Sequence, residues 1–320
     1  DNVATVLMVA PVALGIAKKL KISPVTSIIA IAIASNLEGA ATLVGDTTSI
    51  LLGGYADMTF LDFFFLDGKV GMFWIVQLAM VAAIFVLWLA LRKEKLPINT
   101  NQVEEVNDMF PTWMLLGTIG LLVVASFMSF PEGFPINGVI CVGVYIIGLL
   151  RNVLIKKDTG VVVRSLKEID LFTLLLLGSL FVVIASIGKA GVIEMVAEFF
   201  KTASRGNLFV MYTMIVWFSV ILSAFIDNIP YVATMLPVVT ALNASLGMEG
   251  SYLLYFGLLA GATLGGNLTP IGASANIAGL GILRKEGYNV KAGTFMKLSV
   301  PFTLAAVITG YVLIWFIWKP

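Results

Sequence analysis

The sequence has 320 residues, of which 59% are hydrophobic and 12% are charged, and its formal net charge is +1. Soluble domains are about 45–50% apolar and about 25% charged, so this composition is typical of a chain that lies in a lipid bilayer. Continuous apolar runs of about 17–22 residues favour membrane helices over a β-barrel, and the small net charge gives no field that would attract nucleic acid.

The sequence has few of the residues that bind transition metals or carry protons at neutral pH. It contains no histidine and a single cysteine, Cys141. An internal disulfide and a thiolate metal cluster are therefore excluded, and so is the usual imidazole proton carrier. No phosphate-binding loop of the Walker type is present, which argues against ATP hydrolysis. We therefore expect a protein that is not an enzyme and has no cofactor, apart from bound Na⁺.

The apolar runs predict an all-α membrane protein and, in chain order, lie at residues 3–17, 24–55, 70–91, 112–129, 137–155, 171–188, 207–247, 252–283 and 296–318. Three runs, 24–55, 207–247 and 252–283, are interrupted by polar or Gly/Pro-rich stretches. A polar segment at 92–111 is interpreted as a cytoplasmic linker, and residues 190–203 as an amphipathic surface helix.

Two motifs recur at a nearly constant offset. DNVATVLMVAPV at 1–12 matches DNIPYVATMLPV at 227–238, and TLVGDTTSI at 42–50 matches TPIGASANI at 269–277. Paired, interrupted hydrophobic segments in two halves of a chain are typical of a transporter whose binding site lies at the membrane midplane. We therefore predict a first repeat at 1–91 and a second at 112–320, the second made of scaffold helices 112–188, a hairpin 207–247, a broken helix 252–283 and a last helix 296–318.

The basic residues predict how these segments cross the membrane. If each DN motif is the tip of a re-entrant helical hairpin and 24–55 and 252–283 each cross once as broken helices, most of the 20 basic residues fall on one face, taken as cytoplasmic. The first hairpin then opens to the cytoplasm and the second to the outside, so the repeats are inverted. Since the second repeat has extra crossings before its DN motif, we expect about 100 further residues before Asp1.

Four carboxylates fall in the repeated, broken segments: Asp1, Glu38, Asp46 and Asp227. A carboxylate near the bilayer centre costs about 2.5–3.5 kcal/mol on insertion scales, so each of them suggests a function. Asp1 and Asp227 also suit helix capping, since Asp is a favoured N-cap residue. Capping alone and capping combined with ion contact both remain open. Asp227→Asn separates them, because Asn keeps the capping ability and removes the charge.

The candidate ion and substrate site gathers the polar and glycine residues of the two tips and the two helix breaks. Asparagine offers an acceptor and donors, glycine permits unusual backbone, and freed carbonyls at a helix break can bind Na⁺. The set comprises Asp1, Asn2, Thr42, Gly45, Asp46, Thr47, Asp227, Asn228, Gly266, Asn267, Thr269, Gly272, Ser274 and Asn276. Within it, Asn2, Asp46, Asn228 and Asn276 are the candidate Na⁺ ligands.

DNVATVLMVAPV, NLEGAATLVGDTTSI, SAFIDNIPYVATMLPVV and LGGNLTPIGASANIAGLGI resemble signatures of the Ion Transporter superfamily, nearest to its branch of arsenical pump membrane proteins, melanosomal P protein and NhaD-type antiporters. The resemblance, which extends to dicarboxylate and citrate transporters, implies secondary transporters that work by an elevator motion, often as homodimers. The chain departs from the family pattern in the first half-site, where Glu38 replaces a glycine and Thr47-Thr48-Ser49 replaces Pro-Pro-Asn.

The expected function is secondary active transport of a small inorganic ion or oxyacid, arsenite-like or P-protein-like, coupled to Na⁺ or H⁺. The alternatives are Na⁺/H⁺ exchange, di- or tricarboxylate transport of the citrate kind, and an ion channel. Aspartates at the tips disfavour a multiply charged anion and favour a cation, protons or a neutral oxyacid. The expected partners are the transported ion or anion, Na⁺ or H⁺, the lipid of a plasma or inner membrane and a second copy of the chain, but not nucleic acid.

Overall fold

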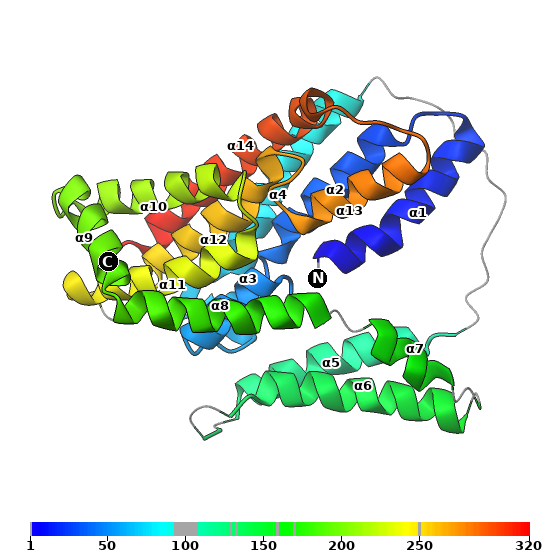
Figure 1. Ribbon diagram of the computed structural model, residues 1–320, viewed down its shortest axis with the longest axis horizontal. Helices are drawn as coiled ribbons and strands as arrows, with labels where there is room; N and C mark the ends of the chain where they lie inside the picture. Colours follow the sequence, from blue (N-terminus) through cyan, green and yellow to red (C-terminus); the bar gives the residue numbers. More distant parts are fainter. Residues whose placement is uncertain are drawn as a thin grey trace. The chain divides into compact units, whose positions relative to one another are not determined.

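A computed structural model describes residues 2–92, 108–128, 130–131, 134–155, 157, 160–168, 171–248 and 251–320. Its contacts divide the chain into two compact units, residues 1–98 with 179–320 and residues 99–178. The predicted linker at 92–111 lies largely outside the described residues, as does Asp1. The described part is nearly all helical (Figure 1).

The larger unit begins with the elements that carry the first copy of each motif. In chain order these are α1 (Asn2–Leu20), α2 (Val25–Gly39), α3 (Thr47–Tyr55), the 3₁₀ turn η1 (Leu61–Phe63), β1 (Phe65–Leu66), β2 (Lys69–Val70) and α4 (Met72–Leu91). The broken helix predicted at 24–55 is thus two helices, α2 and α3, separated by residues 40–46.

The short hairpin of β1 and β2 corrects the prediction of an all-helical chain. The strands pair antiparallel with Phe65 opposite Val70 and Leu66 opposite Lys69. The two residues between them, Asp67 and Gly68, have φ angles of 51° and 74°. An Asp-Gly pair adopts this left-handed conformation readily, and it forms the tight turn that matches the twist of two strands.

The smaller unit contains α5 (Phe110–Ser126), α6 (Ile136–Leu154) and α7 (Gly160–Glu168), and α5 packs against α6. At its end begins α8 (Leu171–Lys189), which continues into the larger unit. After α8 the chain turns by 70° at Gly191 into the amphipathic α9 (Val192–Ser204), close to the bounds predicted for a surface helix.

The rest of the larger unit carries the second copy of each motif. It contains α10 (Leu208–Ser223), α11 (Asn228–Ser245), α12 (Leu253–Gly265), the 3₁₀ turn η2 (Gly266–Leu268), α13 (Ser274–Lys285) and α14 (Ala292–Trp318). The run predicted to be a hairpin at 207–247 is therefore α10 followed by α11, and the second broken helix is α12 with η2 and then α13.

Helix α12 forms the centre of this unit, since all thirteen of its residues are buried. Gly257, Gly261 and Gly265 recur every four residues along one side of it. A Cβ atom on Gly261 would lie 2.5 Å from the carbonyl oxygen of Val216 in α10, and one on Gly265 would lie 2.6 Å from that of Val220. The glycines therefore let two backbones approach closely, as is common between membrane helices.

Four of the described helices, α1, α4, α6 and α14, are long and apolar enough to cross a membrane, and the bent pair of α8 and α9 is a fifth candidate span. On the other side of the larger unit, α1, α2 and α13 lie against one another (Figure 1). Their apolar contacts hold the first copy of the DN motif, in α1, next to the second helix break, which precedes α13.

Candidate functional site

The two helix starts and the two helix breaks meet in the larger unit. Asn2 begins α1 and Asn228 begins α11, while Asp46 ends the first break and Asn267 lies in η2 at the second. All four side chains are buried. Residues more than 200 positions apart in the sequence thus share one polar site.

Asp46 lies at the centre of this site. It is 3% exposed, and among the residues whose side chains the structure describes it is the only acidic or basic one that is fully buried. Its Oδ1 accepts a hydrogen bond from the backbone N–H of Thr47 at 2.7 Å, which caps α3. Its Oδ2 accepts from Asn2 Nδ2 at 3.2 Å, Asn228 Nδ2 at 3.1 Å and Thr48 Oγ1 at 3.3 Å. One carboxylate therefore joins both helix starts to the first break.

Asn36, in the last turns of α2, connects this carboxylate group to the second break. Its Oδ1 accepts from Asn2 Nδ2 at 2.8 Å, and its Nδ2 donates to the Thr263 carbonyl at 2.8 Å and to Asn267 Oδ1 at 3.2 Å. Asn267 Nδ2 donates in return to the carbonyl of Ile33 at 2.8 Å. Both amides are fully buried with hydrogen bonds at each end, so they fix the relative positions of α2 and η2.

The two breaks have the same construction. A Cβ atom on Gly45 would lie 2.6 Å from the carbonyl oxygen of Gly39, and one on Gly272 would lie 2.7 Å from that of Gly266. The same offset of 227 residues relates both glycine pairs. The last residue before each following helix is extended: Asp46 has φ −149° and ψ 159°, and Ala273 has φ −145° and ψ 142°. Equal backbones thus carry a carboxylate in the first break and a methyl group in the second.

The second break is fixed by Thr269, which precedes Pro270. A residue before proline is driven to extended backbone, and Thr269 has φ −124° and ψ 161°. Its Oγ1 donates to the carbonyl of Ala224 at the end of α10 and accepts from Gly272 N at 3.1 Å. The break is therefore held against the chain just before Asp227.

Asp227 is half-buried and is the N-cap of α11, as its position in the motif predicted. Its Oδ1 accepts from the Ile229 N–H at 3.1 Å, and its Oδ2 accepts from Ser274 Oγ at 2.9 Å. The second tip and the start of α13 are thus joined through this aspartate.

Asn276 is fully buried beside the second break. Its Nδ2 donates to the carbonyl oxygens of Gly266 at 3.0 Å and Thr269 at 3.1 Å, whereas its Oδ1 has no hydrogen-bond partner in the described part of the chain. At the equivalent place in the first break, Ser49 Oγ donates to Gly39 O at 3.0 Å. The second break therefore has a buried amide oxygen without a partner, whereas Ser49 at the equivalent place of the first break forms a hydrogen bond.

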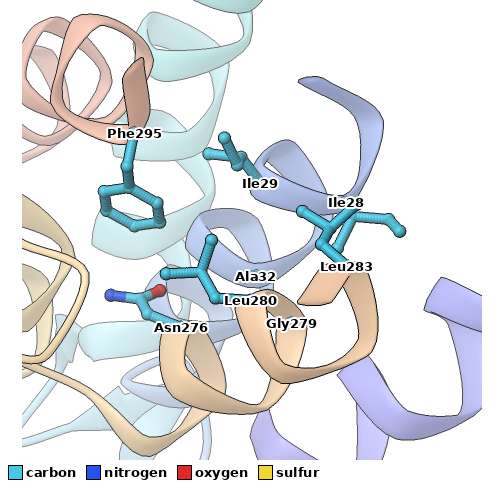
Figure 2. Close-up of a pocket in the computed structure, with 8 residues that line it drawn as sticks. All are labelled: Ile28, Ile29, Ala32, Asn276, Gly279, Leu280, Leu283 and Phe295. Atoms are coloured by element: carbon cyan, nitrogen blue, oxygen red, sulfur yellow. The ribbon is translucent and has the colours of Figure 1, made fainter. Parts of the chain in front are cut away.

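A small pocket lies next to Asn276 (Figure 2). Figure 2 shows the amide at one side of the pocket, with side chains from α2, α13 and α14 around it. The other lining residues are Ile28, Ile29, Ala32, Gly279, Leu280, Leu283 and Phe295. Since this lining is apolar, the pocket belongs to the packing of the three helices, and Asn276 links it to the second break.

The structure distributes the predicted site residues over two clusters. Asn2, Asp46, Asn228 and Asn267 share one network, while Asp227, Ser274, Thr269, Gly272 and Asn276 surround the second break. Thr42, Gly45, Thr47 and Gly266 shape the backbone of the breaks, and Asp1 lies outside the described residues. Sequence reasoning missed Asn36 and Thr263, whose Oγ1 lies 3.1 Å from Thr48 Oγ1. Both are polar residues within apolar runs, a signal that was available.

Apolar helices, two of them broken around a buried carboxylate, define a multi-pass membrane transporter rather than an enzyme. Residues 1–261 match the protein family described as "Citrate transporter". This chain therefore belongs to the citrate transporter family, which bears out the resemblance to the Ion Transporter superfamily.

Several relatives align with nearly the whole chain. A 46 kDa membrane protein of Mycobacterium leprae (strain TN) is 31% identical over 327 aligned positions, covering 98% of this chain and 73% of that protein. An uncharacterized transporter of Mycobacterium tuberculosis (strain CDC 1551 / Oshkosh) is 33% identical over 325 positions, with the same coverage. The human P protein is 35% identical over 154 positions, 45% of this chain and 18% of that protein.

Proposed function

We propose that the chain is a secondary active transporter that moves a small inorganic ion or oxyacid and couples this movement to Na⁺ or H⁺. The observation that carries the proposal is the position of Asp46, a buried carboxylate to which both helix starts donate a side-chain hydrogen bond. A buried carboxylate in a membrane protein is costly to retain, and such residues commonly mark ion pathways.

Asp46, Asn2 and Asn228 form the proposed coupling site. In the described arrangement each asparagine presents its N–H₂ group to the carboxylate. An asparagine amide that turns over presents its carbonyl oxygen instead, so the same three side chains supply oxygens to a bound Na⁺. If the coupled cation is H⁺ instead of Na⁺, protonation of Asp46 neutralises the negative charge of its carboxylate. Either cation therefore changes which hydrogen bonds hold the two helix starts together.

The second break supplies the other part of the proposed site. The unpaired Oδ1 of Asn276 and the carboxylate of Asp227 are oxygen ligands of the kind that a hard cation prefers. The matched construction of the two breaks supports two repeats, which the proposal takes to be inverted, with Asp46 in one half-site and Asp227 in the other. Alternating access then follows from movement of this unit against a scaffold, as in elevator transporters that act as homodimers.

The charged side chains around the proposed site indicate which class of substrate it can bind. Among the side chains that the structure describes, no lysine or arginine is buried, so an anion finds no fixed positive partner in the site. A neutral oxyacid or an inorganic ion that moves with a cation fits this arrangement. Membership of the citrate transporter family favours a second candidate, a di- or tricarboxylate, which needs bound cations to balance its charge for the same reason.

Proteoliposomes that contain the purified chain provide the test. Uptake of radiolabelled arsenite and citrate is measured with an inward Na⁺ gradient, an inward H⁺ gradient and no gradient. Gradient-driven uptake that Asp46→Asn abolishes supports the proposal, and the label that accumulates identifies the substrate class. If an outward H⁺ gradient drives uptake of ²²Na⁺ when neither arsenite nor citrate is present, the chain is a Na⁺/H⁺ exchanger. Single-channel currents faster than transporter turnover contradict secondary transport.

A further inference from the structure

A further carboxylate, Glu38, lies in a membrane segment but outside the Asp46 network and away from Asp227. It is the next-to-last residue of α2, and its Oε2 accepts a hydrogen bond from Gln77 Nε2 of α4 at 2.8 Å. Helix α4 is long and apolar enough to span the membrane. Gln77 lies about 8 Å along this helix from Met72, well inside the span. The pair therefore lies within the apolar layer.

Glu38 and Asp46 lie on different sides of the end of α2. Gly39 faces Asp46, because a Cβ atom on this glycine would lie 2.9 Å from the Cβ of Asp46. Successive side chains on a helix point about 100° apart, and the Glu38 side chain points to α4 instead. Glu38 therefore contacts α4, whereas Asp46 contacts the starts of α1 and α11.

The two carboxylates also differ in how their charge is compensated. Asp46 accepts hydrogen bonds from four donors, whereas the structure gives Glu38 one neutral amide donor. The salt bridges found among the described residues, Lys18–Glu286 and Arg151–Asp108, do not include Glu38. A membrane carboxylate with a single neutral donor lacks a counter-charge.

Several basic residues around α2 lie near its other end, and Lys69, which precedes α4, lies over the Trp318 ring with its Nζ 5.3 Å from the ring centre. Leu283 and Phe295 line the same pocket as Ile28, and the nearby basic residues are Lys18, Lys19, Arg284, Lys285 and Lys297. Glu38 lies ten residues beyond Ile28, about 15 Å along the helix. Glu38 is also half-buried, so the protein does not enclose its side chain on all sides.

We propose that Glu38 and Gln77 form a second binding site for a monovalent cation, a proton or Na⁺, separate from the site at Asp46. The Gln77 amide positions the carboxylate through its N–H₂ group and offers its carbonyl oxygen as a further ligand. The inference rests on the proposed transport function and adds one coupled cation to each transport cycle.

The test is direct cation binding to the purified full chain, which needs no knowledge of the substrate. For Na⁺, equilibrium binding of ²²Na⁺ is compared between the wild type, Glu38→Gln and Asp46→Asn. We expect Glu38→Gln to bind one ion fewer per chain. For H⁺, the infrared band of a neutral carboxyl group is followed as pH rises in Na⁺-free buffer, and we expect Glu38→Gln to lack one titrating carboxyl.

A Glu38→Gln chain with the ²²Na⁺ count and the infrared titration of the wild type overturns the inference. If this variant does not insert, Gln77→Leu replaces it, because it keeps the carboxylate and removes only the amide. We expect about a tenfold weaker affinity at this site for Gln77→Leu, and unchanged affinity contradicts the inference. A different result contradicts the proposed function itself: transport by the wild type that depends on neither the Na⁺ gradient nor the H⁺ gradient.

Discussion

Asn228 donates a hydrogen bond from its side chain to the carboxylate of Asp46, at 3.1 Å, although 182 residues separate the two along the chain. Asn2 donates to the same oxygen at 3.2 Å. The starts of α1 and α11 thus converge on one atom, Asp46 Oδ2. Any change in the charge of that atom acts on both helix starts at once.

Asp46→Asn should abolish cation-driven uptake while the protein still folds and inserts. Asn is about as good an N-cap as Asp, so the cap of α3 is kept, but the negative charge is lost. Uptake in proteoliposomes and the rise in melting temperature on adding Na⁺ are the measurements. A variant that still accumulates substrate down a Na⁺ or H⁺ gradient would leave Asp46 as a helix cap.

Asp227→Asn should also insert normally and lose cation-dependent transport, because its oxygens belong to the second half-site. Ser274→Ala is the matched control, since it removes the 2.9 Å hydrogen bond to Asp227 and leaves the charge in place. We expect this control to keep its Na⁺ and pH dependence with a reduced rate. If transport by both variants depends on Na⁺ and pH as in the wild type, Asp227 acts only as a helix cap.

Gly45→Ala and Gly272→Ala should each destabilise the protein by about 1–3 kcal/mol, because the new methyl group meets a backbone carbonyl that cannot move aside. Gly54→Ala is the control: it lies on the exposed side of α3 with no atom within 4 Å of the added Cβ. Thermal melting in detergent should show a loss for the first two and none for the third. Similar melting temperatures for all three would mean that the breaks are loosely packed.

Single cysteines near the ends of α1 and α11 test the inverted orientation of the two repeats. The exposed Cys141 is first replaced by Ala to remove background labelling. We expect Lys19→Cys to react with an impermeant maleimide from the cytoplasm and Met248→Cys from outside. Reaction of both from the same side would contradict inverted repeats.

The sequence indicated the helix breaks well because they depend on local chemistry. Pro270 forces the extended backbone of Thr269, and Gly45 and Gly272 allow two carbonyls to approach closely. These are properties of single residues, which a sequence reveals directly. The predicted N-capping role of Asp227 is local for the same reason, whereas the cap that Asp46 forms on α3 was not predicted.

The partners of Asp46 and Asn36 could not be deduced in the same way. Asn36 pairs with Thr263 and Asn267, over 227 and 231 residues. Such pairs depend on how helices pack, and no local pattern specifies that. Gln77 is the one polar residue in α4, but its pairing with Glu38, 39 residues away, is of the same non-local kind. The strands on either side of Asp67-Gly68 have two residues each, too few for an alternating pattern to indicate them.

The distance along the chain between Asp46 and Asn228 matters during synthesis of the protein. At about 5–20 residues per second, a ribosome needs about 10–35 s to reach Asn228 after it has made Asp46. During that interval the nascent chain holds a carboxylate that lacks one of its side-chain donors. The hydrogen bonds of Asp46 are therefore complete only when the second half has been made, and a chain truncated before Asn228 should be a preferred target of membrane quality control.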